Sequence, residues 1–110
     1  MNDVERLLDY LEHDETVKQY KAFERLIFDN PTYKAKYTAL TVKQQAYVRA
    51  RETNAKDAEE KRRAYEAYRA TITTDPIVHQ FLMLQADVNA MIQTIAGVIE
   101  SALNAPFTRQ

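Results

Sequence analysis

The sequence predicts an all-α protein, an antiparallel helical bundle with a long helical hairpin and a long C-terminal core helix. Apolar residues recur at spacings of three and four along most of the chain, the pattern of helices with one buried face. The chain has one glycine and three prolines, too few of these turn-forming residues for the many turns of an all-β protein. With 110 residues, 45% of them hydrophobic, the chain is expected to form a single helical domain over residues 1–110.

Residues 3–29 are expected to form the N-terminal helices. The apolar face of the first pattern consists of Val4, Leu7, Leu8 and Leu11. Either Asn2 or Asp3 can cap its start, because a side-chain oxygen there accepts a backbone N–H of the first turn. A second apolar line follows at Val17, Tyr20, Phe23 and Ile27. The pattern leaves open whether these lines belong to one helix or to two helices separated near His13 and Asp14.

Residues 31–73 are expected to form the helical hairpin. Asn30 is a suitable N-cap, and Pro31 suits the first helical position, where its missing N–H costs nothing. The apolar line of the first arm is Tyr33, Tyr37, Leu40, Tyr47 and Val48, and that of the second arm is Ala58, Tyr65, Tyr68 and Ile72. Scarcely any large apolar residue lies between positions 49 and 63. The hairpin is therefore expected to be packed at its root and to stand in water at its tip.

Residues 75–104 are expected to form the C-terminal helix, about 45 Å long. Asp75 and Pro76 repeat the arrangement of Asn30 and Pro31, a capping side chain followed by proline. The core face is expected to be Ile77, Phe81, Leu84, Val88, Ile92, Ile95, Ile99 and Leu103. A membrane span is the rival interpretation, but the polar residues His79, Gln80, Gln85, Asp87, Asn89 and Gln93 make the segment too polar for it.

The other face of this helix carries small or uncharged side chains, where a surface helix ordinarily carries Lys and Glu. Such a face lets a second helix approach closely, and one domain of this size can hardly cover both faces itself. The sequence therefore predicts self-association, as a homodimer or larger oligomer, or association with a related helical protein. The expected contact residues are Leu82, Met83, Ala86 and Ala90. A monomer with a mildly apolar face is the alternative.

Charge is distributed unevenly, although the formal net charge is only −1. Residues 1–30 hold four basic and eight acidic side chains (net −4), residues 31–74 hold ten and five (net +5), and residues 75–110 hold one and three (net −2). A near-neutral chain with a basic middle is not typical of a dedicated DNA-binding protein. The basic residues at the expected hairpin tip are Lys56, Lys61, Arg62 and Arg63. They are expected to favour an acidic partner by charge complementarity, although acidic neighbours at helical spacing ordinarily form a solvated face.

RNA binding by the basic hairpin is the alternative function that the sequence leaves open. The aromatic residues Tyr33, Tyr37, Tyr47, Tyr65 and Tyr68 stand beside basic residues, among them Arg51 and Arg69. Such rings can stack on bases while the cations bind phosphates. Because the tyrosines follow helical spacing, packing in the seam of the hairpin is the preferred interpretation.

No set of residues indicates an enzyme. The sequence has no cysteine, which excludes disulfides, thiolate metal sites and a cysteine nucleophile. It also has neither a glycine-rich phosphate loop nor a Ser/His/Asp set. His13, Asp14 and Glu15 are adjacent, so on a helix they point in different directions rather than toward one metal ion. His79 has no second ligand at a useful spacing. We therefore expect no enzymatic activity, no cofactor, no metal and no small-molecule substrate.

The chain resembles the YlbF/YmcA family of small helical proteins from Gram-positive bacteria. The resemblance is carried by "QYKAFERLIFDNPTYKAKY", by the charged hairpin after it, and by "DPIVHQFLMLQADVNAMIQTIAGVIESAL". Its most telling phrase consists of Gln85, Val88, Asn89, Ile92, Gln93 and Ile95. The resemblance covers nearly the whole chain and implies an all-helical fold with a long hairpin, a tendency to form dimers or mixed complexes, and no enzymatic activity.

The resemblance also implies a regulatory role. Some members act with partner proteins in competence, sporulation and biofilm formation, through control of an mRNA-processing endoribonuclease. Certain members carry C-terminal cysteines linked to iron–sulfur clusters, which this chain, ending in "NAPFTRQ" and without cysteine, does not share. Since the N-terminus has no basic, apolar leader, the chain is expected to be cytoplasmic. The sequence thus predicts a non-enzymatic cytoplasmic adaptor.

Overall fold

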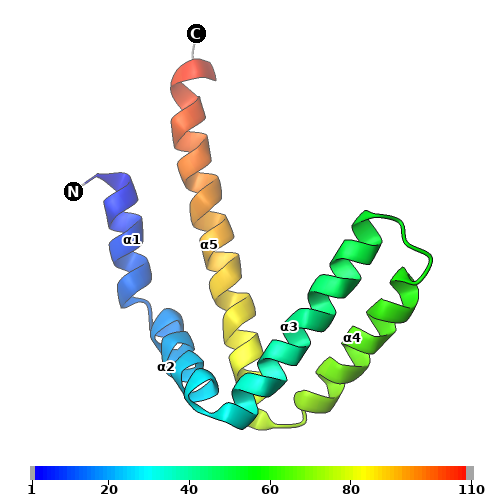
Figure 1. Cartoon of the computed structure of the whole chain (residues 1–110). Coiled ribbons are helices and arrows are strands. Elements are labelled where there is room, and N and C mark those ends of the chain that lie inside the picture. Colours follow the sequence, from blue (N-terminus) through cyan, green and yellow to red (C-terminus); the bar gives the residue numbers. More distant parts are fainter. Residues whose placement is uncertain (1, 109–110) are drawn as a thin grey trace. The chain divides into compact units, whose positions relative to one another are not determined.

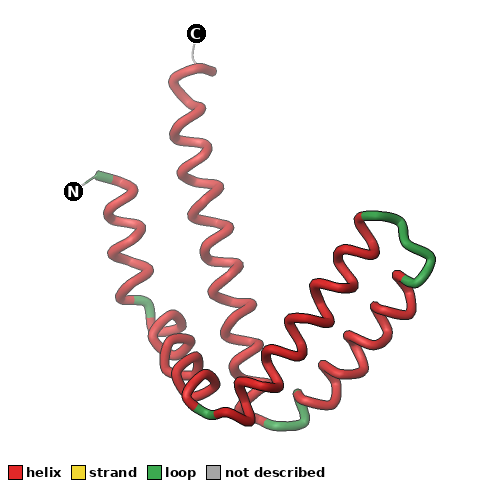
Figure 2. The backbone as a smooth tube through the Cα atoms, in the orientation of Figure 1, coloured by secondary structure: helices red, strands yellow, loops and turns green. Residues whose placement is uncertain are grey.

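The computed structural model describes residues 2–108, and for residue 102 and residues 104–108 it describes the backbone alone. The helices in this range are α1 (Asp3–His13), α2 (Glu15–Asp29), α3 (Pro31–Glu52), α4 (Ala58–Ile72) and α5 (Pro76–Thr108) (Figure 1). Helices and loops account for all of residues 2–108, without a strand (Figure 2). The prediction of an all-α protein with a helical hairpin and a long C-terminal helix is confirmed.

The chain divides into two compact units. The first unit comprises residues 1–22 and 82–110, which hold α1, the start of α2 and most of α5. The second comprises residues 23–81, which hold the end of α2, the α3–α4 hairpin and the start of α5. The expected single domain over residues 1–110 stays a prediction.

The N-terminal region contains two helices, which answers the question that the sequence left open. Asp14 separates them, because its backbone is extended, with φ −67° and ψ 135°. The Asp14 side chain then caps α2, its Oδ1 accepting the N–H of Val17 at 3.2 Å. Asn2 caps α1 in the same way, its Oδ1 accepting the N–H of Glu5 at 2.8 Å. Asp14 therefore both ends α1 and caps the start of α2.

The root of the hairpin is packed, as predicted. The buried apolar residues at the root are Ile27, Leu40, Ile72, Val78 and Phe81, while Ala50 is buried near the tip. The Tyr37 ring lies between Phe28 and Phe81, with ring centroids 5.4 Å apart in both pairs and edge-to-face geometry. Asn30 caps α3 as expected, its Oδ1 accepting the N–H of Thr32 at 2.9 Å. Aromatic pairs of this geometry add to the stabilisation that burial provides.

The tip of the hairpin is closed by a Schellman motif at the end of α3. The N–H of Ala55 donates to the carbonyl of Ala50 at 2.9 Å, and the N–H of Asn54 donates to the carbonyl of Arg51 at 3.3 Å. Asn54 takes the left-handed conformation that this motif requires, with φ 54°. The motif satisfies carbonyls that the helix end would otherwise leave without partners.

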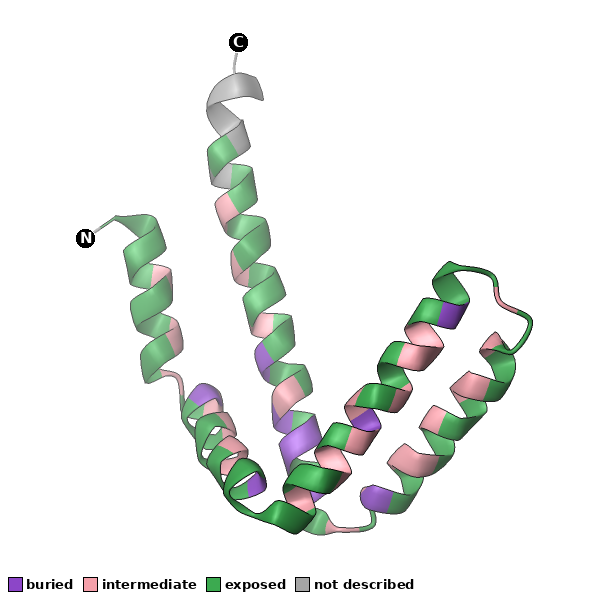
Figure 3. Ribbon diagram, viewed as in Figure 1, coloured by how far each residue is buried: buried purple, intermediate pink, exposed green. Residues whose placement is uncertain are grey.

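Helix α5 starts where the sequence predicts and runs past the expected end at Asn104, to Thr108. Oδ1 of Asp75 accepts the N–H of Ile77 at 2.9 Å, which caps the helix at its proline. The expected core stripe is buried only in the first half of the helix, at Phe81, Leu84 and Val88 (Figure 3).

The rest of the expected stripe is not buried: Ile92 is 49% and Leu103 66% exposed, and Ile95 and Ile99 are half-buried. At the level of Ile92, α1 faces Met91 and Ile95 on the neighbouring side of α5. At Leu103 the cause is the length of the covering helices. Residues 3–22 of the first unit, at about 1.5 Å per residue, cover at most about 30 Å, whereas residues 82–108 of α5 extend over about 40 Å.

Candidate functional site

Three of the four residues expected to bind a partner on α5 are exposed. Ala86 and Ala90 are accessible, and Met83 is 49% exposed. Leu82 is only 7% exposed, so it belongs to the core of the chain and not to an accessible face. The prediction was wrong about the solvent exposure of Leu82 because Leu82 lies at the edge of that face, about 80° around the helix from Ala90.

An apolar groove lies between α1 and α5 within the first unit. It has a volume of about 390 Å³ and is lined by Leu7, Tyr10, Ala90, Met91, Thr94, Ile95 and Val98. No residue of α1 is buried, and Leu8 and Tyr10 are 56% and 61% exposed. On α5, Ile92 and Val98 are 49% and 51% exposed. The first unit thus leaves several large apolar side chains exposed on α1 and on more than one side of α5.

The length and composition of α5 also fit a membrane span. Residues Pro76–Ser101 have a mean hydropathy of 1.3 over the best window, of which 17% is buried. Core helices of soluble proteins can be as long and as apolar, but they are mostly buried, which this segment is not; a single such helix is weak support for a membrane. The polar side chains between positions 79 and 93 make insertion costly.

The basic side chains at the hairpin tip are largely paired within α4 and its N-terminal turn. Lys61 pairs with Asp57 at 3.1 Å, and Arg63 pairs with Glu59 at 3.4 Å. Arg62 pairs with Glu59 and, at 2.9 Å, with Glu66. The two glutamates raise the pKa of Arg62, and Arg62 in turn lowers the pKa of Glu59. Of the expected tip residues, only Lys56 lacks an ion pair within residues 2–108.

The tyrosines of the hairpin are half-buried, as packing in its seam requires. The rings of Tyr47 and Tyr65 meet across the two arms, with centroids 6.4 Å apart. Cations lie over several of the rings: Lys36 over Tyr33 at 5.8 Å, Lys43 over Tyr68 at 5.5 Å and Arg51 over Tyr47 at 5.4 Å. The rings are thus engaged by neighbouring side chains of the chain itself.

Tyr33 and Asp75 link the start of α3 to the start of α5 within the second unit. A hydrogen bond to the Asp75 carboxylate raises the pKa of Tyr33. The pKa of Asp75 is lowered, first by the backbone N–H of Ile77 and then by Tyr33 and the charge of Lys36. The sequence identified Asp75 as a cap but not this second role, because nothing local relates positions 33 and 75.

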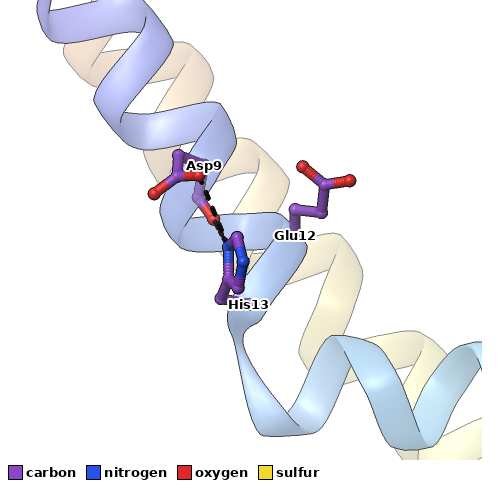
Figure 4. Close-up of side chains that lie close together, drawn as sticks. All are labelled: Asp9, Glu12 and His13. Carbon is purple, nitrogen blue, oxygen red and sulfur yellow. Dashed lines mark hydrogen bonds and ion pairs between the residues drawn. The ribbon is translucent and has the colours of Figure 1, made fainter. Parts of the chain in front are cut away.

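Among the described residues, the potential metal ligands that the structure brings together are Asp9, Glu12 and His13, with ligand atoms within 4.8 Å of one another (Figure 4). All three side chains are exposed. Nδ1 of His13 lies 2.9 Å from the carbonyl oxygen of Asp9, which only accepts, so this nitrogen carries the hydrogen. The histidine is therefore engaged as a cap of the α1 C-terminus. Exposed acidic groups are common without an ion, and the absence of a metal site stays a prediction.

One family model matches residues 1–104, a range that holds α1 to α4 and most of α5. Its description is "Control of competence regulator ComK, YlbF/YmcA". No curated protein and no solved structure matches the chain.

Proposed function

The chain belongs to the YlbF/YmcA family, and from this membership we propose that it is a non-enzymatic adaptor of the cytoplasm that acts by associating with itself or with a related helical protein. The family's description, control of the competence regulator ComK, assigns it to regulation. By the same resemblance, we connect the adaptor with control of mRNA processing in competence, sporulation or biofilm formation.

The observation that carries the proposal is the apolar surface of the first unit. On the proposed face of α5, Met83 is 49% exposed, and Ala86 and Ala90 are exposed beside it, in a chain with 28% charged residues. Burying such side chains against a second helix is favourable by about 25 cal/mol for each Å² removed from water. The small residues Ala86 and Ala90 let that helix approach closely.

The proposal is tested by measuring molecular mass as a function of protein concentration. The variant Met83→Glu with Ala90→Glu puts two charges on the proposed contact face, seven residues apart. We expect the natural chain to have the mass of a dimer or larger oligomer at micromolar concentration and this variant to have that of a monomer.

The matched control is Asn89→Glu with Ala96→Glu, which adds the same two charges at the same spacing. Both positions are exposed and lie about 100° or more around the helix from Met83 and Ala90, the two positions that the variant changes. The control is expected to keep the mass of the natural chain. A monomeric natural chain at all concentrations, or equal dissociation of both variants, would contradict association through this face.

RNA binding is the alternative function, and salt separates it from protein docking. Phosphate contacts release counterions, so RNA affinity falls steeply between about 50 and 200 mM salt, by a factor that grows with the number of contacts. Stacking on the hairpin would need Tyr65, so a Tyr65→Ala variant with unchanged affinity indicates only non-specific attraction. Under the adaptor proposal, association with protein persists in the presence of ribonuclease.

A further inference from the structure

We propose that the hairpin carries a docking groove for an acidic helix of a partner protein, in which Arg51 and Arg69 bind two carboxylates about two helical turns apart. This inference rests on the proposed adaptor function, since it names the surface with which the adaptor holds its partner. It also moves the expected contact from the tip of the hairpin to the seam between its arms.

The groove runs between α3 and α4 in the second unit. It has a volume of about 490 Å³ and is lined by Gln44, Tyr47, Val48, Arg51, Tyr65, Glu66 and Arg69. A second hollow of about 460 Å³ adjoins it along α3, since Gln44 and Val48 line both. A seam between two antiparallel helices is a natural place for a third helix to pack.

The same short motif, a tyrosine followed four residues later by an arginine, occurs at the seam on each arm. Tyr47 precedes Arg51 on α3, and Tyr65 precedes Arg69 on α4. The two tyrosine rings meet across the seam at 6.4 Å. Because the arms run in opposite directions, Arg51 lies toward the tip from this pair and Arg69 lies toward the root. Four residues correspond to about 6 Å on each side, so the two arginines are about 12 Å apart along the hairpin axis.

Both guanidinium groups are available to a ligand. Within residues 2–108 neither Arg51 nor Arg69 forms an ion pair, and Arg51 is held over the Tyr47 ring at 5.4 Å. Glu66, the acidic residue lining this groove, is already neutralised by Arg62 at 2.9 Å. The charges of Arg51 and Arg69 are thus not neutralised by an ion pair within residues 2–108, in contrast to those of Lys61, Arg62 and Arg63 near the tip.

The geometry favours carboxylates on a helix. Arginine binds a carboxylate through two parallel N–H donors, and residues seven apart on a helix present side chains on one face about 10.5 Å apart. An apolar side chain midway between two such carboxylates would then lie over Tyr47, Tyr65 and Val48. RNA is less well suited, because it needs a continuous basic track and exposed ring faces, and these rings are half-buried.

The test uses a 15-residue alanine-rich helical peptide that carries two glutamates seven positions apart with a leucine midway between them. Its affinity for the full chain is measured by fluorescence anisotropy at physiological salt. We expect saturable binding, at least ten-fold weaker when both glutamates are replaced by glutamine. A peptide of the same charge with the glutamates three positions apart is expected to bind at least five-fold more weakly, because it reaches one arginine at a time.

The protein variants separate the groove from general charge. Arg51→Gln with Arg69→Gln removes two charges from the groove and is expected to weaken peptide binding at least ten-fold. Its matched control, Lys61→Gln with Arg63→Gln, removes two charges near the tip, leaves the pair of Arg62 with Glu66 in place, and is expected to change binding by less than two-fold. Circular dichroism verifies that both variants keep the helical content of the natural chain.

Equal losses in the two variants, or equal affinity for the two glutamate spacings, would overturn the proposal. Tighter binding of a uridine homopolymer than of the peptide, lost in the groove variant, would overturn it in favour of RNA. Failure here is distinguishable from failure of the adaptor proposal: the groove variant is expected to keep the mass of the natural chain, and Met83→Glu with Ala90→Glu is expected to keep the peptide affinity.

Discussion

Replacing Gly97 by alanine tests whether the second half of α5 is open to solvent in the single chain. It is exposed in the middle of a long helix, and a Cβ built on it meets no atom of another part of the chain within 4 Å. Glycine in a helix interior is unfavourable because it loses more conformational freedom on folding than any other residue. Gly97→Ala is therefore expected to stabilise the protein.

The magnitude follows from helix propensity. Alanine is better than glycine in a helix interior by about 1 kcal/mol, and nothing in the single chain offsets this gain. For a chain of about this size, 1 kcal/mol raises the melting temperature by about 4 °C. Thermal unfolding followed by circular dichroism at low protein concentration measures the shift. The neighbouring Ala96→Gly is the control, expected to lower the melting temperature by a similar amount, since Ala96 is also exposed.

A fall in the melting temperature of Gly97→Ala would refute this reasoning, because the added methyl group would then meet an atom that the single chain does not place there. If the same variant also lowered the mass of the oligomer, a second helix would be the source of that atom. The contact face on α5 would then extend beyond Ala90 toward the C-terminus.

Three further predictions concern the turns and caps. Asn54→Gly is expected to stabilise the hairpin by about 0.5–1 kcal/mol and Asn54→Val to destabilise it by about 1–2 kcal/mol, since the residue has φ 54°; urea titration measures both. Asn30→Ala is expected to cost about 1 kcal/mol in the same titration, because it leaves the N–H of Thr32 without its acceptor. The lowered pKa of Asp75 means that its carboxylate stabilises the fold fully above about pH 4 and progressively less as the pH falls through that lower pKa. Asp75→Asn, which can still cap but does not titrate, is expected to flatten part of the acid side of the stability profile; an unchanged acid profile would argue against this linkage.

Local signals predicted the boundaries of the hairpin well. Asn30 with Pro31 and Asp75 with Pro76 each combine a capping oxygen with a residue whose missing N–H costs nothing at that position, and both start a helix in the structure. Such devices act within a few residues, so no knowledge of tertiary packing is needed to recognise them. Asp14 acts in the same way, although the sequence alone did not settle the break at that position.

Burial along α5 could not be predicted from its own periodicity. Leu82 is buried although it was assigned to the accessible face, and Ile92 is exposed although it continues the core stripe. Periodicity states which side chains share a face, but the position of the covering helix decides which face is covered: α1 faces Met91 and Ile95 and leaves Ile92 exposed. The ion pairs of Arg62 with Glu59 and Glu66 are, by contrast, local, since these residues lie three and four positions apart, and contact of the tip with a partner stays a prediction.

The groove on the hairpin depends on the register between its arms. Tyr47 and Arg51 are neighbours on α3 whatever the fold, as are Tyr65 and Arg69 on α4, but only the turn decides that the two tyrosines meet. That turn is the Schellman motif at Asn54, whose hydrogen bonds fix where α3 ends. The spacing of the two arginines is therefore a property of the turn, which is why it is invisible to any window of sequence that covers only one arm.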